Sequence, residues 1–223
     1  MMNKSRGQMY GFVTHTWNAI KGKCPHDCVY CYMKRFPQKD LHFDEKELKT
    51  DLGKGNFIFV GSSCDMFAEE IPTEWIKRVL DYCSSFPDNK YLFQTKNPVR
   101  FLGFNCFPKN TILGTTIETN REVGLKYSQA PPIISRLSAM RKIKGRKMIT
   151  IEPIFDFDVV FIEYLQMIKP EWINIGADSN KKSNYIIPEP SKEKVIDLIN
   201  SCKCFTEVKI KDNLGRLMNT TIP

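Results

Sequence analysis

Short apolar runs alternate with amphipathic stretches along most of this 223-residue chain. Runs of this kind, bounded by polar or turn-forming residues, are typical of buried strands. They predict seven strands, at residues 9–14, 56–60, 91–94, 111–115, 147–151, 172–175 and 207–210.

Between these runs, apolar residues recur at helical spacing. One face of residues 73–84 is apolar, which predicts an amphipathic helix that starts at the N-cap Thr73 and buries Cys83. Further helical patterns follow Pro131-Pro132, cover residues 160–168, follow the N-cap Ser191, and form short pieces at 32–36 and 99–104.

Strands that alternate with helices, without hairpin dipeptides between them, indicate βαβ units and a parallel sheet. Six or seven units are fewer than the eight that close a full barrel of about 250 residues. The pattern therefore predicts an α/β fold, a partial (β/α)6-7 TIM-like barrel with parallel strands, as a single domain over residues 1–223.

In such barrels the functional residues lie where the strands end. Polar side chains follow most of the predicted strands, and we expect them to surround the opening at one end of the barrel. They are Cys24, Cys28, Cys31, Ser62, Ser63, Cys64, Asp65, Gln94, Thr95, Lys96, Glu118, Asn120, Glu152, Asp178, Lys211 and Asn213.

The densest chemistry lies in residues 21–32, KGKCPHDCVYCY, where Cys24, Cys28 and Cys31 are spaced C-x3-C-x2-C. Thiolates are soft ligands for iron-sulfur clusters and for zinc. A [4Fe-4S] cluster would take these three cysteines and leave one iron open, whereas zinc would need a fourth ligand such as His26 or His15.

The cysteine spacing, the aromatic Tyr30 before the last cysteine and the position after a first strand resemble the radical S-adenosylmethionine (SAM) superfamily. The wider stretch 14–32, with the later tracts IEP (151–153) and KDN (211–213), is similar to a small single-domain branch that includes phage-encoded members and is distantly akin to spore photoproduct lyase. The resemblance implies a [4Fe-4S] cluster on the three cysteines that cleaves SAM reductively to a 5′-deoxyadenosyl radical, and a one-electron donor such as flavodoxin or ferredoxin.

The resemblance also implies where SAM binds. Gly61, Ser62 and Ser63 occupy the place of the family's glycine-rich motif, which here lacks its second glycine and its glutamate. Residues expected to contact the cofactor are Tyr30, Gly61, Ser62, Ser63, Glu118, Asn120 and Arg136, with Arg136 suited to the SAM carboxylate.

Three residues are candidates for the catalytic step. Cys64 follows the second predicted strand, and its weak S–H bond makes it a plausible hydrogen donor, as a cysteine is in the spore photoproduct lyase chemistry. Glu152 ends an apolar strand and should face the site, as should Lys211 after the last strand.

Charge and composition bear on partners and compartment. The net charge of +8 and the pI of about 9.0 are compatible with a polyanionic partner. Lys181, Lys182, Lys209, Lys211 and Arg216 lie near or beyond the last two strands, where they would meet phosphates, whereas the basic run 141–147 should lie on the opposite face.

The chain has no apolar run of about 18 residues and no signal-like start, so we expect a cytoplasmic protein without membrane contact. Eight cysteines suit metal binding in a reducing compartment. Three functions remain open: a radical SAM enzyme acting on nucleic acid or nucleotides, one acting on a small metabolite or a peptide, and a non-enzymatic zinc-binding module.

Overall fold

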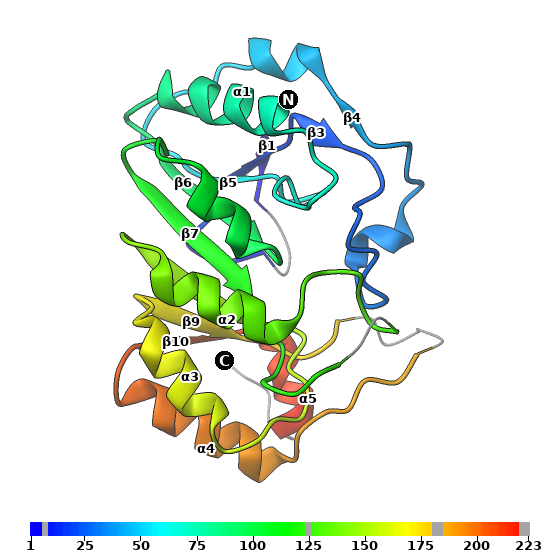
Figure 1. Cartoon of the computed structure of the whole chain (residues 1–223), viewed down its shortest axis with the longest axis vertical. Helices are drawn as coiled ribbons and strands as arrows, with labels where there is room; N and C mark the ends of the chain where they lie inside the picture. Colours follow the sequence, from blue (N-terminus) through cyan, green and yellow to red (C-terminus); the bar gives the residue numbers. More distant parts are fainter. Residues whose placement is uncertain (6–8, 124–125, 180–184, 219–223) are drawn as a thin grey trace.

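An eight-stranded sheet forms the centre of the protein, in the order β1-β2-β5-β6-β7-β8-β9-β10 (Figure 1). The computed structural model describes residues 1–5, 9–123, 126–179 and 185–218. The strands are β1 (Asn3–Lys4), β2 (His15–Trp17), β5 (Phe57–Val60), β6 (Lys90–Thr95), β7 (Thr111–Thr116), β8 (Lys147–Ile151), β9 (Trp172–Ile175) and β10 (Glu207–Ile210).

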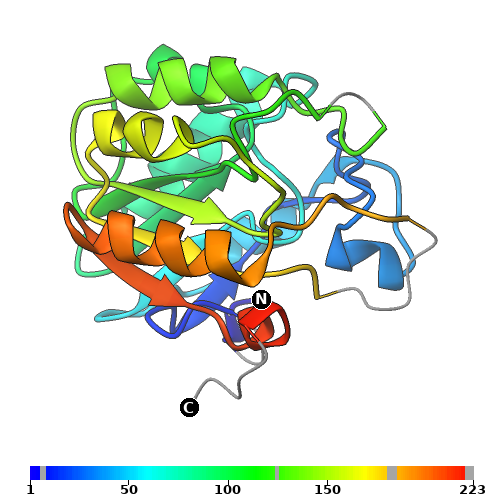
Figure 2. The same cartoon turned by 90° about the horizontal axis from the view of Figure 1, so that it is seen from below.

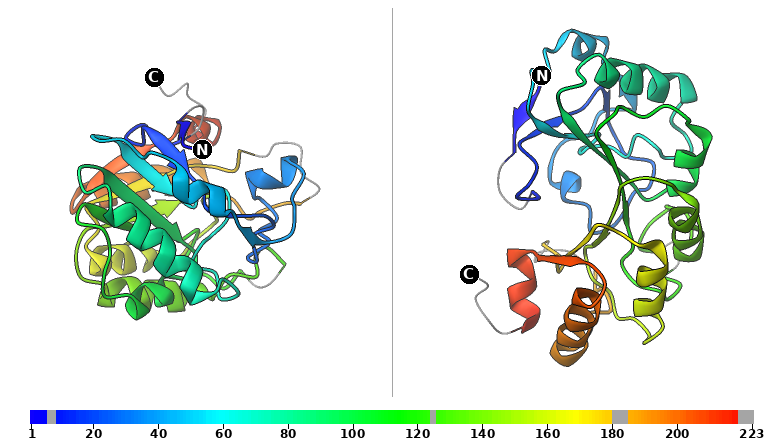
Figure 3. Two further views of the ribbon diagram at one scale, coloured as in Figure 1. Left: turned by 90° about the horizontal axis from the view of Figure 1, so that it is seen from above. Right: turned by 90° about the vertical axis from the view of Figure 1, so that its left-hand side faces the viewer.

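All strands from β2 to β10 in this sheet run parallel, and only β1 pairs antiparallel at the edge. The strands β1 and β10 are both edges, so the barrel stays open, as the right-hand view of Figure 3 shows. The predicted partial barrel is therefore confirmed, and the last three strands have the predicted bounds.

The helices cover the outer face of this sheet. The strands are strongly apolar because both faces of the sheet are buried. They are α1 (Thr73–Ser84), α2 (Ile133–Lys142), α3 (Phe161–Ile168) and α4 (Lys192–Lys203). Helix α1 buries Ile76, Val79, Leu80 and Cys83, as the spacing predicts, although its N-cap is Pro72 and not Thr73. Ser191 does cap α4, because its side chain accepts from the Lys194 N–H.

The segment 9–14 is not a strand, which corrects the sequence prediction. Residues 9–13 instead lie against the inner face of the sheet, where Tyr10 and Val13 are buried with Leu92 and Met148. Their apolar pattern reflects burial inside the barrel, and a short buried run cannot be assigned to a strand by composition alone.

Three smaller features surround the cysteine loop and the chain end. A two-stranded sheet, β3 (Ile20–Lys21) with β4 (His42–Phe43), brackets the loop, and the predicted short helix is present as η1 (Tyr32–Arg35). Further short helices are η2 (Glu45–Lys49), η3 (Pro98–Gly103), η4 (Asp212–Leu214) and α5 (Gly215–Met218).

Within the described residues, no helix is long and apolar enough to span a membrane.

The packing of the segment 9–13 gives a first prediction. The ring of Phe12 lies 5.1 Å from that of Phe57 and 5.0 Å from that of Trp172, measured between centroids. Because Phe12 is partly buried, we expect Phe12→Ala to lower the free energy of unfolding by about 2 kcal/mol, as a lower midpoint in urea would show. Val159→Ala, at a side chain that is 80% exposed, is the control and should change it by less than about 0.5 kcal/mol. Equal effects of the two variants would contradict the proposed packing.

Candidate active site at the cysteine loop

A cavity of about 460 Å³ opens at the carboxyl ends of the parallel strands. Its lining includes Cys24, Cys28 and Cys31 together with residues that follow β5, β6, β8 and β10. The volume lies in the range of ordinary ligand sites, about 300–1,000 Å³. Polar residues from distant parts of the chain thus meet at one mouth.

The cysteine loop is shaped by two backbone turns. The Asp27 N–H donates to the Cys24 carbonyl at 3.1 Å, and the Cys31 N–H donates to the Cys28 carbonyl at 3.1 Å. Cys28 is buried, with its Sγ 3.1 Å from Ser128 Oγ, whereas Cys24 and Cys31 are partly exposed. In the ranges that the structure describes, no three Cys, His, Asp or Glu side chains gather as one metal ion would require.

Burial raises the pKa of the Cys28 and Cys31 thiols. Cys24 differs because the neighbouring Cys64 thiol hydrogen-bonds to it, which lowers the pKa of Cys24 to about 7 despite burial. The same contact raises the pKa of Cys64. Cys64 is therefore a neutral thiol beside the predicted ligands.

Asp65 ties the cysteine loop to the sheet. Its Oδ2 accepts from His26 Nε2 at 2.9 Å, from Thr95 Oγ1 at 2.9 Å and from the Lys96 N–H at 2.7 Å. Its Oδ1 accepts from the Phe67 N–H at 3.0 Å. Burial raises the pKa of Asp65, but His26 and the backbone donors outweigh it, so that this pKa lies below its usual value.

Glu118 is the centre of a buried charge cluster. Its Oε1 accepts from Tyr30 OH at 2.6 Å and from Lys96 Nζ, and its Oε2 accepts from Arg136 Nη1 at 2.9 Å. Burial raises the pKa of Glu118, but Lys96 and Arg136 outweigh it and lower that pKa to about 2. The cluster contains the cations Lys96 and Arg136 and the anion Glu118. Two of its members, Tyr30 and Lys96, line the cavity.

A second charged cluster joins the ends of β8 and β10. Glu152 accepts from Lys211 Nζ at 2.7 Å and from Asn213 Nδ2 at 2.8 Å. A Cβ on Gly176 would lie 2.9 Å from Asn213 Oδ1 and 3.0 Å from Glu152 Cδ, so a larger residue there would force these two side chains to shift. Glu152 and Lys211 both line the cavity, in contact with each other.

The loop after β5 is held by a side chain that the sequence did not single out. Asn18 Oδ1 accepts from the Ser63 N–H at 3.0 Å and from Ser62 Oγ at 3.3 Å. Gly61 has a φ of +79°, which favours glycine, and its N–H donates to the Trp17 carbonyl at 3.0 Å.

The sequence profile of the family described as "Protein of unknown function (DUF5131)" matches residues 9–193. The chain belongs to this family. Solved structures of spore photoproduct lyase are similar to this DUF5131 chain. A cysteine-to-alanine mutant with dinucleoside spore photoproduct has a TM-score of 0.66 at 12% identity, and the match covers 92% of this chain and 78% of that one.

A double mutant of the same lyase with bound AdoMet and dinucleoside spore photoproduct has a TM-score of 0.65 at 13% identity, with the same coverage. At this identity the likeness establishes the fold of the DUF5131 chain and not its reaction. No curated protein matches the sequence.

The structure sorts the predicted cofactor residues of this DUF5131 chain into two groups. Tyr30, Gly61, Ser62 and Ser63 line the cavity. Glu118 and Arg136 are 1% and 2% exposed and lie behind the lining, where they bind each other. Asn120 accepts from the Asp158 N–H at 2.8 Å and is likewise outside the lining.

The predicted basic residues do not all lie at the mouth. Lys211 lines the cavity, but Lys209 Nζ lies 5.3 Å from the Trp172 ring centre at the opposite end of the strands, which corrects the expected position. Arg216 binds Glu189. Lys181 and Lys182 lie outside the described residues.

Asn18, Tyr10 and Ser128 are site residues that sequence reasoning missed. The Tyr10 hydroxyl lies at the cavity, 2.8 Å from Gln94 Oε1 and 2.7 Å from Thr150 Oγ1, although its segment looked like a strand. Ser128 is 100 positions from its partner Cys28. Of these three residues, Asn18 alone directly follows a strand, β2, which is where site residues are expected in such barrels.

The Glu118 cluster gives a second prediction. We expect Glu118→Gln to lower the free energy of unfolding at pH 7 by about 3 kcal/mol, because it leaves buried cations without their counter-ion. The pKa of this carboxyl is about 2 in the fold against 4.5 ordinarily, so its contribution is complete above about pH 4.5 and is lost as the pH falls towards 2. The difference between wild type and variant, measured by urea unfolding, should shrink over that window.

Glu171→Gln is the matched control, since that carboxylate pairs with Arg146 at the exposed surface. It should change the free energy by less than about 0.5 kcal/mol. A loss at Glu171 as large as that at Glu118, or a difference that does not vary with pH, would contradict the assignment.

Proposed function

We propose that this chain is a radical SAM enzyme that holds a [4Fe-4S] cluster on Cys24, Cys28 and Cys31. The observation that carries the proposal is that these cysteines, spaced C-x3-C-x2-C, line the cavity at the carboxyl ends of a partial barrel. When bound, the cluster supplies the electron that cleaves SAM to methionine and a 5′-deoxyadenosyl radical, which takes hydrogen from the substrate.

The donor set suits a cluster better than a closed zinc site. A closed zinc site would need a fourth protein ligand beside the three cysteines, for which His26 and His15 are the candidates. His26 is engaged by Asp65, and His15 is not part of the cavity lining. The zinc-binding module therefore stays the weaker alternative.

For SAM we propose contacts with Tyr30, Gly61, Ser62 and Ser63, the predicted cofactor residues that face the cavity. Glu118 and Arg136 then act as positioning residues outside the cavity lining, because Glu118 holds Tyr30 and Lys96 and Arg136 pairs with Glu118. The predicted contact of Asn120 with the cofactor stays a prediction.

We assign the substrate side of the cavity to Cys64, Glu152 and Lys211. Cys64 is a neutral thiol that lines the cavity, as a hydrogen donor must. Glu152 and Lys211 present a carboxylate and an ammonium group at the same opening, suited to orient a polar substrate. Below them, Leu92, Ile112 and Met148 form an apolar layer that excludes water.

As substrate we propose nucleic acid or a nucleotide, with a small metabolite or a peptide as the alternative. The net charge of +8 supports a polyanion, and Lys211 places a cation at the mouth. We also propose that the chain belongs to a branch with phage-encoded members and that it is cytoplasmic. Its electron would come from a flavodoxin-like or ferredoxin-like donor.

The third prediction tests the cluster. After anaerobic reconstitution with iron and sulfide, the wild type should bind about four irons and form 5′-deoxyadenosine from SAM under reduction. Cys24→Ala, Cys28→Ala and Cys31→Ala should each lose the iron absorption and reduce 5′-deoxyadenosine to background. Cys106→Ala, at an exposed cysteine away from the cavity, is the control and should behave as wild type. Stoichiometric zinc without iron absorption would end the enzyme proposal.

The fourth prediction separates the two substrate classes. If the substrate is a nucleic acid, the affinity for a single-stranded oligonucleotide should fall steeply as the salt concentration rises, because phosphate contacts release counter-ions. Lys211→Gln should weaken this binding and reduce the salt slope by about one. A salt-independent affinity, or no binding, would favour a metabolite or peptide.

A further inference from the structure

Most of the positive charge of the chain lies at the amino ends of the strands. The six loops that lead into β5, β6, β7, β8, β9 and β10 contain ten Lys or Arg residues and four Asp or Glu residues, a net charge of +6. They are residues 51–57, 85–90, 104–111, 141–147, 168–172 and 203–207.

The segments that follow the strands, at the mouth of the cavity, are close to neutral. They contain twelve basic and thirteen acidic residues. These segments are residues 18–40, 61–72, 96–97, 117–132, 152–160, 176–191 and 211–218. The net charge of +8 is therefore concentrated at the end of the barrel away from the cavity.

Five exposed cations at the starts of three neighbouring strands form the densest part of this charge, and we name them the amino-end surface. They are Lys109 before β7, Arg141, Lys142 and Lys144 before β8, and Lys169 before β9. Among the residues that the structure describes, none of the five has an ion-pair partner.

The cations of the two clusters at the mouth are in a different state. Lys96 pairs with Glu118, and Lys211 pairs with Glu152. These charges are already neutralised by the protein, whereas those of the amino-end surface are available to an external anion.

Backbone hydrogen bonds hold the three strand starts together. The Leu113 N–H of β7 donates to the Arg146 carbonyl at 3.0 Å, and the Glu171 N–H donates to the Lys147 carbonyl at 2.8 Å. Neighbouring strands lie about 4.8 Å apart, so the starts of β7, β8 and β9 span about 10 Å. The five cations therefore form one surface.

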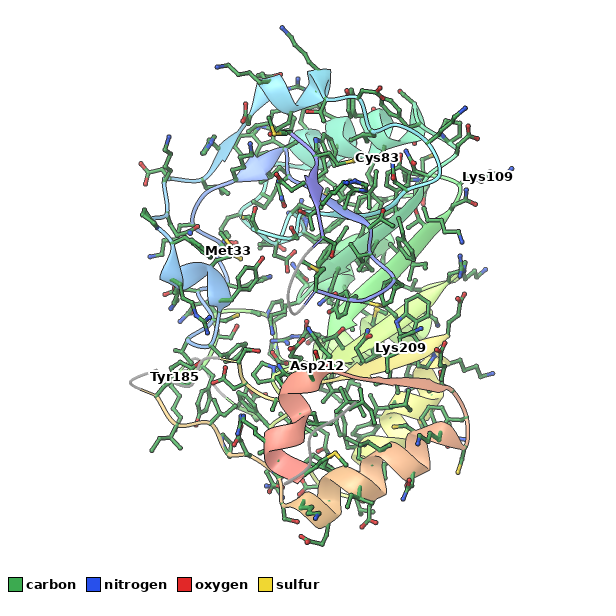
Figure 4. The ribbon with its side chains drawn as sticks, turned by 180° about the vertical axis from the view of Figure 1, so that it is seen from behind. Met33, Cys83, Lys109, Tyr185, Lys209 and Asp212 are labelled. Atoms are coloured by element: carbon green, nitrogen blue, oxygen red, sulfur yellow. The ribbon has the colours of Figure 1, made fainter. Side chains whose placement is uncertain are left out.

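The amino-end surface faces away from the cavity. In Figure 4, Lys109 lies on the opposite side of the molecule from Met33, which lines the cavity. Figure 2 shows the strand arrows pointing toward η1, so that the loops preceding the strands lie at the far end. A strand of six residues, such as β6, is about 20 Å long. A group bound at one end of the barrel therefore does not touch the other.

The positive charge also acts on a buried lysine. Lys147 is 9% exposed, and its Nζ donates to the Met140 carbonyl at 3.2 Å. Burial lowers the pKa of Lys147, and the charge of Lys169 lowers it further. In the described part of the chain no carboxylate pairs with Lys147, so an anion bound nearby would stabilise its charged form.

A hollow of about 260 Å³ extends the basic surface towards β6 and β10. Its lining includes the cations Lys90, Arg146 and Lys209. Both of its acidic residues are engaged, because Glu171 pairs with Arg146 and Glu207 pairs with Lys209. The exposed Lys90 has no ion-pair partner within the described ranges, which leaves a further cation for an external anion.

We propose that the amino-end surface binds the phosphate backbone of a duplex nucleic acid, as a docking site separate from the cavity. The inference does not rest on the proposed function, because binding here needs neither a cluster nor SAM and holds whatever the substrate is. The mouth faces away from the bound duplex, so the docked segment is not the segment or molecule that reaches the cavity. The surface holds the protein on the polymer while the mouth stays open.

The make-up of the surface favours nucleic acid over a membrane or a protein. Five of the seven residues 141–147 are Lys or Arg, a density typical of nucleic-acid contacts. Membrane insertion needs exposed apolar side chains, whereas Ile143, the one apolar residue of this run, is 6% exposed. The core of a protein interface is depleted of charge. Cations that contact phosphates without reading bases give binding that is independent of sequence.

The fifth prediction measures binding of fluorescently labelled duplexes of arbitrary sequence by fluorescence anisotropy, one of DNA and one of RNA. A duplex is the probe because it is too large to enter the cavity of about 460 Å³ at the mouth. At low salt, R141E/K142E/K144E should bind at least tenfold more weakly than wild type, because phosphate contacts are lost. The slope of log affinity against log salt concentration should become shallower by about three.

A second variant separates loss of charge from its reversal. R141Q/K142Q/K144Q should weaken binding in the same direction by a smaller factor. The phosphate contact is common to both duplexes, so the variants should weaken DNA and RNA binding alike, and the wild-type affinities show which polymer is bound more tightly.

The matched control reverses three exposed cations elsewhere, as K46E/K77E/K192E, in η2, in α1 and at the start of α4. It changes the net charge by the same amount and should keep the affinity within about threefold of wild type. Equal weakening by K46E/K77E/K192E and R141E/K142E/K144E would overturn the inference, because it would reflect net charge alone. Wild-type affinity in R141E/K142E/K144E would overturn it as well.

Vesicles of phosphatidylserine and phosphatidylcholine test the membrane alternative. Wild type that binds these vesicles but neither duplex would overturn the inference and assign the surface to anionic lipid. Iron uptake is a separate measurement, whose failure would overturn the proposed function and not this inference.

Discussion

The buried carboxylate of Asp65 holds the parts of the site together. It accepts hydrogen bonds from the cysteine loop through His26, from the end of β6 through Thr95 and the Lys96 N–H, and from its own loop through Phe67. Three segments that are far apart in sequence therefore share one acceptor. Because an unpaired donor is costly in a buried setting, the loop that carries the cysteines has few alternative positions.

Two charged clusters extend this frame around the cavity. The Glu118 cluster supports Tyr30 and Lys96, and the Glu152 cluster joins β8 to the segment after β10. The partners of Glu118 include Tyr30 from the cysteine loop and Lys96 from the end of β6, and the partners of Glu152 come from the segment after β10. The mouth of the barrel is thus defined by tertiary hydrogen bonds, which suits a site that must hold reacting groups at fixed positions.

The two ends of the barrel differ in chemistry. At the carboxyl ends of the strands, Gln94, Thr150 and Lys211 are polar and line the cavity. Towards the other end, Tyr10 and Val13 pack with Leu92 and Met148 into an apolar layer. The barrel is open, so the apolar inner face of its sheet would contact water if nothing covered it. The segment 9–13 covers that face.

Local elements and the chemistry they carry could be predicted from the amino-acid sequence alone. The strand 147–151 and the helix 73–84 follow from periodicity, because burial of one face or both faces leaves a pattern in neighbouring residues. The cysteine spacing is equally local, so the sequence also predicts the ligand set and the likeness to the radical SAM superfamily.

Which side chains face the cavity depends instead on the tertiary fold. Arg136 binds Glu118 behind the lining, and Ser128 reaches Cys28, because these contacts join residues that no local pattern relates. The segment 9–14 shows the same limit, since an apolar run records that it is buried but not what it is buried against.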